Sequence, residues 1–224
     1  MSACVKTELL LVICGAGPLK DVSTLISQIL ARGWNVQALA TSSAVSVGLD
    51  IESVQTQTGR LVVTSAAIPR ATLSPSIIVV APATANTITK LALDIRDTYA
   101  AGVLGQAVAA KIPIIMLPSI KKVDLERGIF RKHIQSLRRE GVNVLLGGST
   151  GIHPTNASSK DGPVPLFPWH LAASAAFSRM NAPFCLSKWQ IDSLNVFKTD
   201  ISLRWAVGLL AAISAAVVLG RYQK

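Results

Sequence analysis

Residues 77–81 constrain the fold most strongly, because these five residues are all apolar and do not alternate with polar ones. Such a run is typical of a parallel strand that is covered by helices on both faces. Proline donates no hydrogen bond to a sheet ladder, so we expect the strand to end at Pro82. Asn86 or Thr87 can then cap a helix that starts at Ile88. This arrangement would leave free N–H groups at the edge where open α/β sheets bind ligands, although a strand and a capped helix also form without any ligand.

Three more apolar runs are each followed by a loop of glycine, proline, serine or threonine. They are residues 9–14, 36–40 and 112–117. Residues 142–146 suit a last strand, and residues 61–64 a short one. Apolar residues at helical spacing predict a helix after the first run, another over residues 86–111 and another over residues 123–140. Strands that alternate with helices indicate a doubly wound parallel α/β domain, Rossmann-like or flavodoxin-like.

The first turn contains Gly15 and Gly17, which suggests a dinucleotide-binding site. The third glycine of that motif would fall at position 20, where the chain has Lys20, and the second strand ends in hydroxyl residues instead of a carboxylate. An NAD site needs that carboxylate for the ribose hydroxyls. The hydroxyl residues that begin at Thr41 can instead donate hydrogen bonds to a phosphate, although they also suit an ordinary polar turn.

Composition limits which other ligands and compartments fit this chain. Half of the residues are hydrophobic and 15% are charged, so a large core or a membrane segment must account for the apolar excess. Three cysteines without CxxC spacing argue against a disulfide framework and a zinc site, and they favour a reducing compartment. The net charge of +10 is spread along the chain without interleaved aromatic residues, so we expect no nucleic-acid binding. The start of the chain lacks the pattern of a signal peptide, so we expect a cytoplasmic protein.

Residues 82–87, which read Pro-Ala-Thr-Ala-Asn-Thr, and the following Lys90 and Asp97 closely resemble the PASANT-type signature of the flavin-containing cysteine decarboxylases. The chain is similar to this superfamily, and to its poorly characterised bacterial flavoproteins, over roughly residues 8–175. The resemblance implies an FMN cofactor, a small-molecule or peptide substrate, and an assembly of trimers or their multiples. It also implies that Asn86 serves both cofactor and substrate. The residues that we assign to the cofactor are Gly15, Ala16, Gly17, Thr41, Ser42, Ser43, Pro82, Ala83, Thr84, Asn86, Thr87, Pro118 and Ser119.

The chain departs from the family pattern at three places. Ala16 stands where the family usually has a serine, so one hydroxyl contact to the phosphate is missing. No histidine occurs between residues 1 and 132, and Ile68 stands near the position of the catalytic histidine of the decarboxylases. Residues 118–124 keep the proline of the family's Pro-x-Met-Asn-x-x-Met substrate clamp but lack both methionines and the asparagine. We therefore expect an FMN-dependent enzyme, decarboxylase-like or an oxidoreductase, whose substrate is not phosphopantothenoylcysteine.

Two other functions stay open. One is a flavin-binding regulatory or carrier subunit without turnover, and the other is an NAD(P)-binding oxidoreductase, which Lys20 disfavours. His170 follows a Phe-Pro-Trp stretch that opens a helix, and we consider it a candidate to replace the missing base. A capped helix whose Trp169 packs on the core accounts for the same residues. His153 is interpreted as an exposed residue of the loop over residues 147–165.

The chain changes in character after the flavoprotein domain, which we place at residues 1–176. Residues 177–200 are mixed and polar and are expected to form a linker. Within the C-terminal segment 201–224, residues 205–220 are apolar on every face of a helix, with aromatic and basic residues at both ends as at membrane interfaces. These 16 residues fall short of the roughly 20 that cross a bilayer comfortably. We expect either a C-terminal membrane anchor or a helix buried against a neighbouring subunit.

Overall fold

The computed structural model describes residues 7–64, 74–146 and 167–181 of the chain. The strands are β1 (Glu8–Ile13), β2 (Asn35–Ala40), β3 (Ile77–Ala83), β4 (Ile114–Pro118) and β5 (Asn143–Val144). The helices are the short 3₁₀-helix η1 (Gly17–Asp21), α1 (Val22–Ala31), α2 (Ser42–Val47), α3 (Ile51–Thr58), α4 (Ala85–Ala92), α5 (Tyr99–Ala109), α6 (Lys122–Glu126), α7 (Gly128–Arg139) and α8 (Trp169–Asn181).

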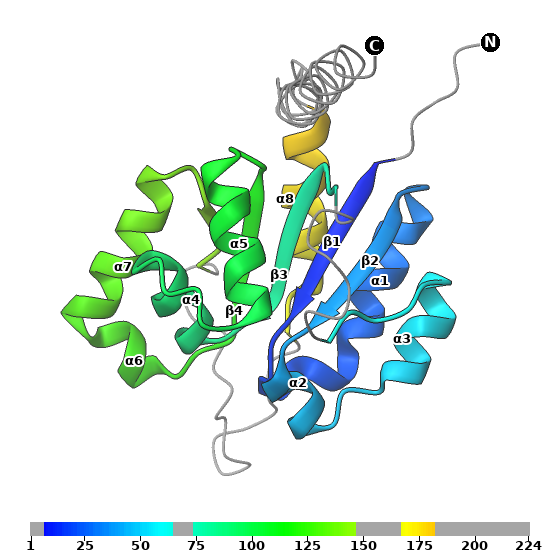
Figure 1. The fold of residues 1–224 in the computed structure, drawn as a ribbon, viewed down its shortest axis with the longest axis horizontal. Helices are drawn as coiled ribbons and strands as arrows, with labels where there is room; N and C mark the ends of the chain where they lie inside the picture. Colours follow the sequence, from blue (N-terminus) through cyan, green and yellow to red (C-terminus); the bar gives the residue numbers. More distant parts are fainter. Residues whose placement is uncertain (1–6, 65–73, 147–166, 182–224) are drawn as a thin grey trace, which may run out of the picture. The chain divides into compact units, whose positions relative to one another are not determined.

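The strands form one parallel sheet in the order β2-β1-β3-β4-β5 (Figure 1). From β1 the chain passes first to β2 on one side and then to β3 on the other side of β1. The strand order therefore reverses between β1 and β3, and the carboxyl ends of these two strands form the switch point at which such sheets bind ligands. The predicted doubly wound α/β fold is confirmed.

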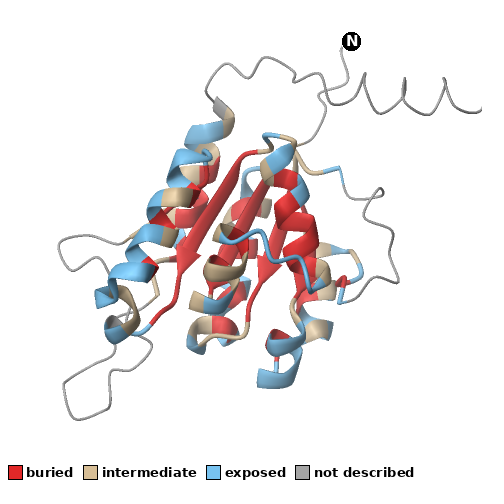
Figure 2. Ribbon diagram, turned by 60° about the vertical axis from the view of Figure 1, so that its left-hand side comes forward, coloured by how far each residue is buried: buried red, intermediate tan, exposed pale blue. Residues whose placement is uncertain are grey.

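The sheet is buried on both faces, which explains the absence of alternation in the apolar runs (Figure 2). Leu9, Leu11 and Ile13 of β1 pack with residues of α1 and α8 on one face. Leu10 and Val12 pack with residues of α4, α5 and α7 on the other face. In Figure 1, α8 lies on the opposite side of the sheet from α5. Both faces of the sheet are therefore core, and a ligand can approach only at the strand ends.

The strand β3 differs from the sequence prediction at its carboxyl end. We expected Pro82 to end the strand, but β3 continues to Ala83, which pairs with Pro118 of β4. The register between the two strands shifts between Val80 and Ala83, because Pro82 has no N–H group with which to continue the ladder. The extra residues move the start of the following helix.

The helix after β3 was also predicted with the wrong cap and the wrong length. Thr84, and neither Asn86 nor Thr87, is the N-cap of α4, because its Oγ1 accepts a hydrogen bond from the backbone N–H of Thr87. The predicted helix over residues 86–111 is interrupted between α4 and α5, where Asp94 has a φ of 52° and Thr98 caps the new helix. The predicted helix over residues 123–140 is likewise divided into α6 and α7.

The helix that we expected after the Phe-Pro-Trp stretch is α8. It runs for 13 residues, past the boundary placed at residue 176, and its Trp169 is buried in the core beside α1. The ring of Phe177 lies edge-on against Trp34, with ring centroids 5.0 Å apart. These contacts fix the last described helix against the sheet.

Several sequence predictions lie outside the described residues. They include Ile68, His153, the loop over residues 147–165 and the apolar residues 205–220. Within residues 7–64, 74–146 and 167–181, no helix has the length and apolar character needed to cross a membrane.

Candidate functional site

The loops after β1 and β2 are in direct contact at the carboxyl edge of the sheet. A Cβ atom on Gly15 would lie 2.5 Å from the backbone oxygen of Ser43, so only glycine fits at this position without a shift of the backbone. Thr41 caps α2, because its Oγ1 accepts a hydrogen bond of 3.3 Å from the N–H of Ala44. The same Oγ1 lies 3.0 Å from the hydroxyl of Ser43. The first turn and the hydroxyl residues after β2 are therefore neighbours.

The end of β1 also contacts the loop between β3 and α4. The N–H of Cys14 donates to the carbonyl of Pro82 at 3.3 Å, and its Sγ lies 3.3 Å from the hydroxyl of Thr87. Burial raises the pKa of the Cys14 thiol. A thiol with a raised pKa is a poor nucleophile at neutral pH, so Cys14 is a packing residue beneath the site.

At the end of β4, Ser119 has a buried hydroxyl that is not hydrogen-bonded within the described residues. The side chain is 5% exposed, and its Oγ has no partner there. Its backbone N–H donates to the carbonyl of Ala83 at 2.8 Å, which holds the loop after β4 beside the end of β3. A buried hydroxyl without a partner is costly, so this atom is a natural donor or acceptor for a bound group.

A pocket of about 420 Å³ opens between α2, α4 and the start of α5, and we call it the α4–α5 pocket. This volume lies within the range of about 300–1,000 Å³ that is usual for small-molecule sites. The described residues that line it are Leu39, Ala40, Thr41, Ser42, Ser43, Thr64, Asn86, Thr87, Lys90, Thr98, Tyr99, Ala100 and Ala101. Hydroxyl groups and one amide therefore dominate its polar surface.

Among these lining residues, Lys90 is the only charged one. Its Nζ lies 2.8 Å from Oδ2 of Asp97, which is not itself a lining residue. Asn86 lies one helical turn before Lys90 and is exposed, with no hydrogen bond to its side chain in the described part of the chain. A pocket with hydroxyl and amide groups, one cation and no carboxylate among its described lining residues is suited to an anionic ligand.

The structure brings together some of the residues that the sequence analysis assigned to the cofactor. Thr41, Ser42, Ser43, Asn86 and Thr87 all line the α4–α5 pocket. The remaining assigned residues lie at the same edge of the sheet but are not among its described lining residues. They are Gly15, Ala16, Gly17, Pro82, Ala83, Thr84, Pro118 and Ser119.

The candidate base His170 is exposed at the start of α8. It is not among the described residues that line the pocket, and α8 covers the opposite face of the sheet from α4 and α5. Within one chain, the described structure does not bring His170 to the α4–α5 pocket.

Sequence reasoning missed Thr64, Lys90, Thr98 and Tyr99 as lining residues. The signal for Lys90 was present, because residues four apart on a helix share a face and Lys90 lies four positions after Asn86. Thr64 had no comparable signal, since it is placed by a single bridge between Val63 and Leu39 of β2.

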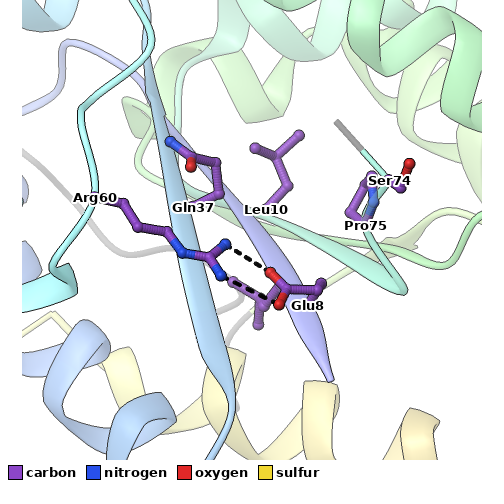
Figure 3. A pocket seen from close by; sticks show the side chains of 7 residues that line it. Glu8, Leu10, Gln37, Arg60, Ser74 and Pro75 are labelled. Carbon is purple, nitrogen blue, oxygen red and sulfur yellow. Dashed lines mark hydrogen bonds and ion pairs between the residues drawn. The ribbon is translucent and has the colours of Figure 1, made fainter. Parts of the chain in front are cut away.

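A second pocket lies at the amino end of β1, and its charged side chains already neutralise each other (Figure 3). The guanidinium of Arg60 donates to both carboxylate oxygens of Glu8, at 2.7 and 3.2 Å, and Asn35 donates to Glu8 as well. The hydrogen bond from Arg60 holds the pKa of Glu8 below its usual value. The pair therefore stabilises the fold at neutral pH, and this contribution is lost as the pH falls through the lowered pKa. We interpret this pocket as a structural contact.

The described residues do not assemble a metal site. In residues 7–64, 74–146 and 167–181, no group of three or more His, Cys, Asp or Glu side chains is arranged to hold a metal ion.

In a comparison with protein families, the sequence model described as Flavoprotein matches residues 2–163. A comparison with curated protein sequences found no significant match.

Solved structures share the fold at low sequence identity. The FMN binding protein AtHal3 superposes with a TM-score of 0.63 and 18% identity, over 80% of this chain and 100% of that one. The FMN-dependent cysteine decarboxylase TvaF, from thioviridamide biosynthesis, superposes with a TM-score of 0.56 and 24% identity, over 62% of this chain and 89% of that one. The DmrB protein of Burkholderia xenovorans is described as a cubic protein cage for redox transfer. It superposes with a TM-score of 0.52 and 22% identity, over 63% of this chain and 88% of that one. At these identities the likeness shows the shared fold.

Proposed function

Because the chain belongs to the Flavoprotein family, we propose that it binds FMN in the α4–α5 pocket and acts as an FMN-dependent enzyme. The observation that carries the proposal is the lining of the pocket, which offers hydroxyls, an amide and one cation but no carboxylate among its described residues. FMN carries a phosphate that such groups can bind, whereas an NAD site needs a carboxylate for the ribose hydroxyls. The FMN-binding protein and the FMN-dependent decarboxylase of the same fold support this choice.

The residues at the sheet edge fit a phosphate-bearing cofactor in three respects. Gly15 lets the first turn pack directly on the backbone of Ser43, so the first turn and the hydroxyl residues after β2 lie together at the sheet edge. The hydroxyl of Ser42 is exposed and has no hydrogen-bond partner in the described residues, so it is free to donate to a phosphate. The buried hydroxyl of Ser119 offers a further unsatisfied group at the end of β4.

In this proposal the protein binds and orients, while FMN, when bound, supplies the ability to accept hydride equivalents. The exposed amide of Asn86 offers both a donor and an acceptor at the pocket, so it can hold a substrate group beside the cofactor. The neighbouring Thr87 cannot do this as easily, because its hydroxyl already contacts Cys14 and Thr84. We therefore assign the contact with substrate to Asn86 in preference to His170.

We also propose that the protein assembles with copies of itself, as the sequence resemblance implies. In support, Val45 and Val47 on α2 and Leu93 and Ile95 after α4 are apolar side chains that are between 40% and 60% exposed. Contact with a second copy of the chain would bury such side chains.

Titration of the flavin-free protein with FMN, FAD and NAD tests the proposed cofactor. We expect FMN to bind most tightly, because the pocket offers hydroxyls, an amide and one lysine to a single phosphate and no described lining carboxylate to the ribose of a dinucleotide. Isothermal titration calorimetry measures the three affinities under one set of conditions. Tighter binding of NAD than of FMN would show that the cofactor has been assigned wrongly.

Replacement of Asn86 by alanine tests the assignment of the loop. Because this side chain is exposed and makes no hydrogen bond within the described residues, Asn86→Ala should leave the unfolding free energy within about 0.5 kcal/mol of the wild type. The loss of a hydrogen bond to the ligand should weaken FMN binding about fivefold, since one such bond contributes about 1 kcal/mol. Fluorescence titration and denaturant unfolding measure the two quantities. Unchanged FMN affinity and unchanged turnover would remove Asn86 from the site.

A further inference from the structure

The α4–α5 pocket contains one cation, Lys90, whose contact with the ligand the proposed function does not specify. Lys90 and Asn86 project from the same face of α4, because they are four residues apart. The side chain of Lys90 is 23% exposed, and its ammonium is held by Asp97 at 2.8 Å. An ammonium has three donors, so the contact with one carboxylate oxygen leaves donors available for a ligand in the pocket.

A bound phosphate needs positive charge that the other described lining residues cannot supply. A phosphate monoester carries a charge of about −1.5 to −2 at pH 7. The hydroxyls of Thr41 and Ser43 are neutral and already contact each other. Ala16 in the first turn has no hydroxyl to add. Hydrogen bonds from a cation to an anion are roughly twice as strong as those between neutral groups.

We propose that Lys90 binds the phosphate group of FMN and that Asp97 positions the lysine. The inference rests on the proposed function, because it assumes that FMN occupies the α4–α5 pocket. Asp97 precedes Thr98, the N-cap of α5, so its carboxylate is anchored at the start of that helix. The ion pair therefore holds the ammonium between α4 and the start of α5 before any ligand arrives, which lowers the entropy cost of binding.

The competing interpretation is that the ion pair only connects α4 to α5. Exposed ion pairs contribute little to stability, typically between about 0 and 1 kcal/mol. In that case the loss of Lys90 and the loss of Asp97 would have equal effects, and each would change the affinity for every ligand of the pocket alike. If Lys90 binds phosphate, its loss would affect only ligands that carry a phosphate.

The test compares FMN with riboflavin, which lacks the phosphate. Both flavins are titrated into the full-length flavin-free protein, and binding is followed by quenching of flavin fluorescence. We expect Lys90→Met to weaken FMN binding about tenfold, which corresponds to about 1.4 kcal/mol, and to leave riboflavin binding within about twofold. Lys90→Arg keeps the charge and should restore most of the FMN affinity.

Two further variants serve as controls. Lys132→Met removes the same charge from an exposed position on α7 that is not among the described lining residues, so it should change neither affinity. Asp97→Asn leaves the lysine charged but less well positioned, so the loss of FMN affinity should be smaller than for Lys90→Met.

The remaining outcomes overturn the inference. Equal losses of FMN and riboflavin affinity in Lys90→Met, matched by Asp97→Asn, would show a purely structural ion pair. Unchanged FMN affinity in Lys90→Met would also show that Lys90 does not bind the phosphate. Failure of the wild-type protein to bind either flavin would instead reject the proposed function, and the inference with it.

Discussion

Phosphopantothenoylcysteine is expected to be decarboxylated by this protein at least about a hundredfold more slowly than by a decarboxylase specific for that substrate. The loss of a positioned general base typically costs about a hundredfold to ten-thousandfold in rate. The chain has no histidine before His133, and Ile68 stands near the position that the family resemblance gives to the catalytic histidine. Residues 119–124 also lack the methionines and the asparagine of the substrate clamp.

The assay should use protein with its FMN content verified, beside a phosphopantothenoylcysteine decarboxylase under identical conditions. Release of carbon dioxide and formation of the product thiol report the rate. The verified cofactor content ensures that a slow rate cannot be ascribed to missing FMN. Conversion at a comparable rate would contradict the alignment of Ile68 and of the clamp.

Gly15→Ala should lower the unfolding free energy by about 1–3 kcal/mol, which is the usual cost of inserting atoms into a closely packed site. The new Cβ would lie 2.5 Å from the backbone oxygen of Ser43, and neither of these backbone segments can move as a flexible side chain would. Relief of the clash would displace either the first turn or the start of α2. FMN affinity should therefore fall together with stability, and chemical denaturation and flavin titration measure the two effects.

Gly128→Ala is the matched control for this substitution. Gly128 is the first residue of α7, and a Cβ at this position would meet nothing within 4 Å. Alanine is favoured over glycine in helices by up to about 1 kcal/mol, so this variant should be as stable as the wild type or slightly more stable. If Gly15→Ala matched Gly128→Ala in unfolding free energy and FMN affinity, the close contact between Gly15 and Ser43 would contribute to neither property.

The sheet was predictable because parallel strands that are buried on both faces leave continuous apolar runs in the sequence. β1, β3 and β4 lie within one or two residues of the predicted runs, although β3 continues through Pro82. β5 was placed correctly but pairs over Asn143–Val144 only. The resemblance to flavin-containing proteins is confirmed by the match to the Flavoprotein family.

The helix boundaries were less predictable, because several residues near each boundary can serve as caps. Good N-cap residues stand at three positions, Thr84, Asn86 and Thr87. Thr84 is the cap because the backbone is extended there, and this cannot be read from the sequence. No glycine or proline marks the interruption between α4 and α5. There the turn depends on Asp94 in a left-handed conformation, which asparagine and aspartate tolerate better than most residues.

The candidate site followed partly from sequence, since the loops at the ends of parallel strands converge on one edge. Thr41 and Asn86 follow β2 and β3 and line one pocket, as this convergence predicts. Lys90 was not expected there, because α4 begins three residues before Ile88, where we expected the helix to start. The separation of His170 from the pocket was not predictable, because the side of the sheet that α8 covers depends on tertiary packing.

The absorption spectrum of the purified protein is the most direct test of FMN binding. We expect a yellow protein whose chromophore is released on denaturation and co-elutes with FMN on chromatography, in about one molecule per chain if the α4–α5 pocket holds it. Reconstitution with added FMN should restore the spectrum if the cofactor is lost during purification. A protein that remains colourless after such reconstitution, or that releases a nicotinamide dinucleotide instead, would show that FMN is not its cofactor.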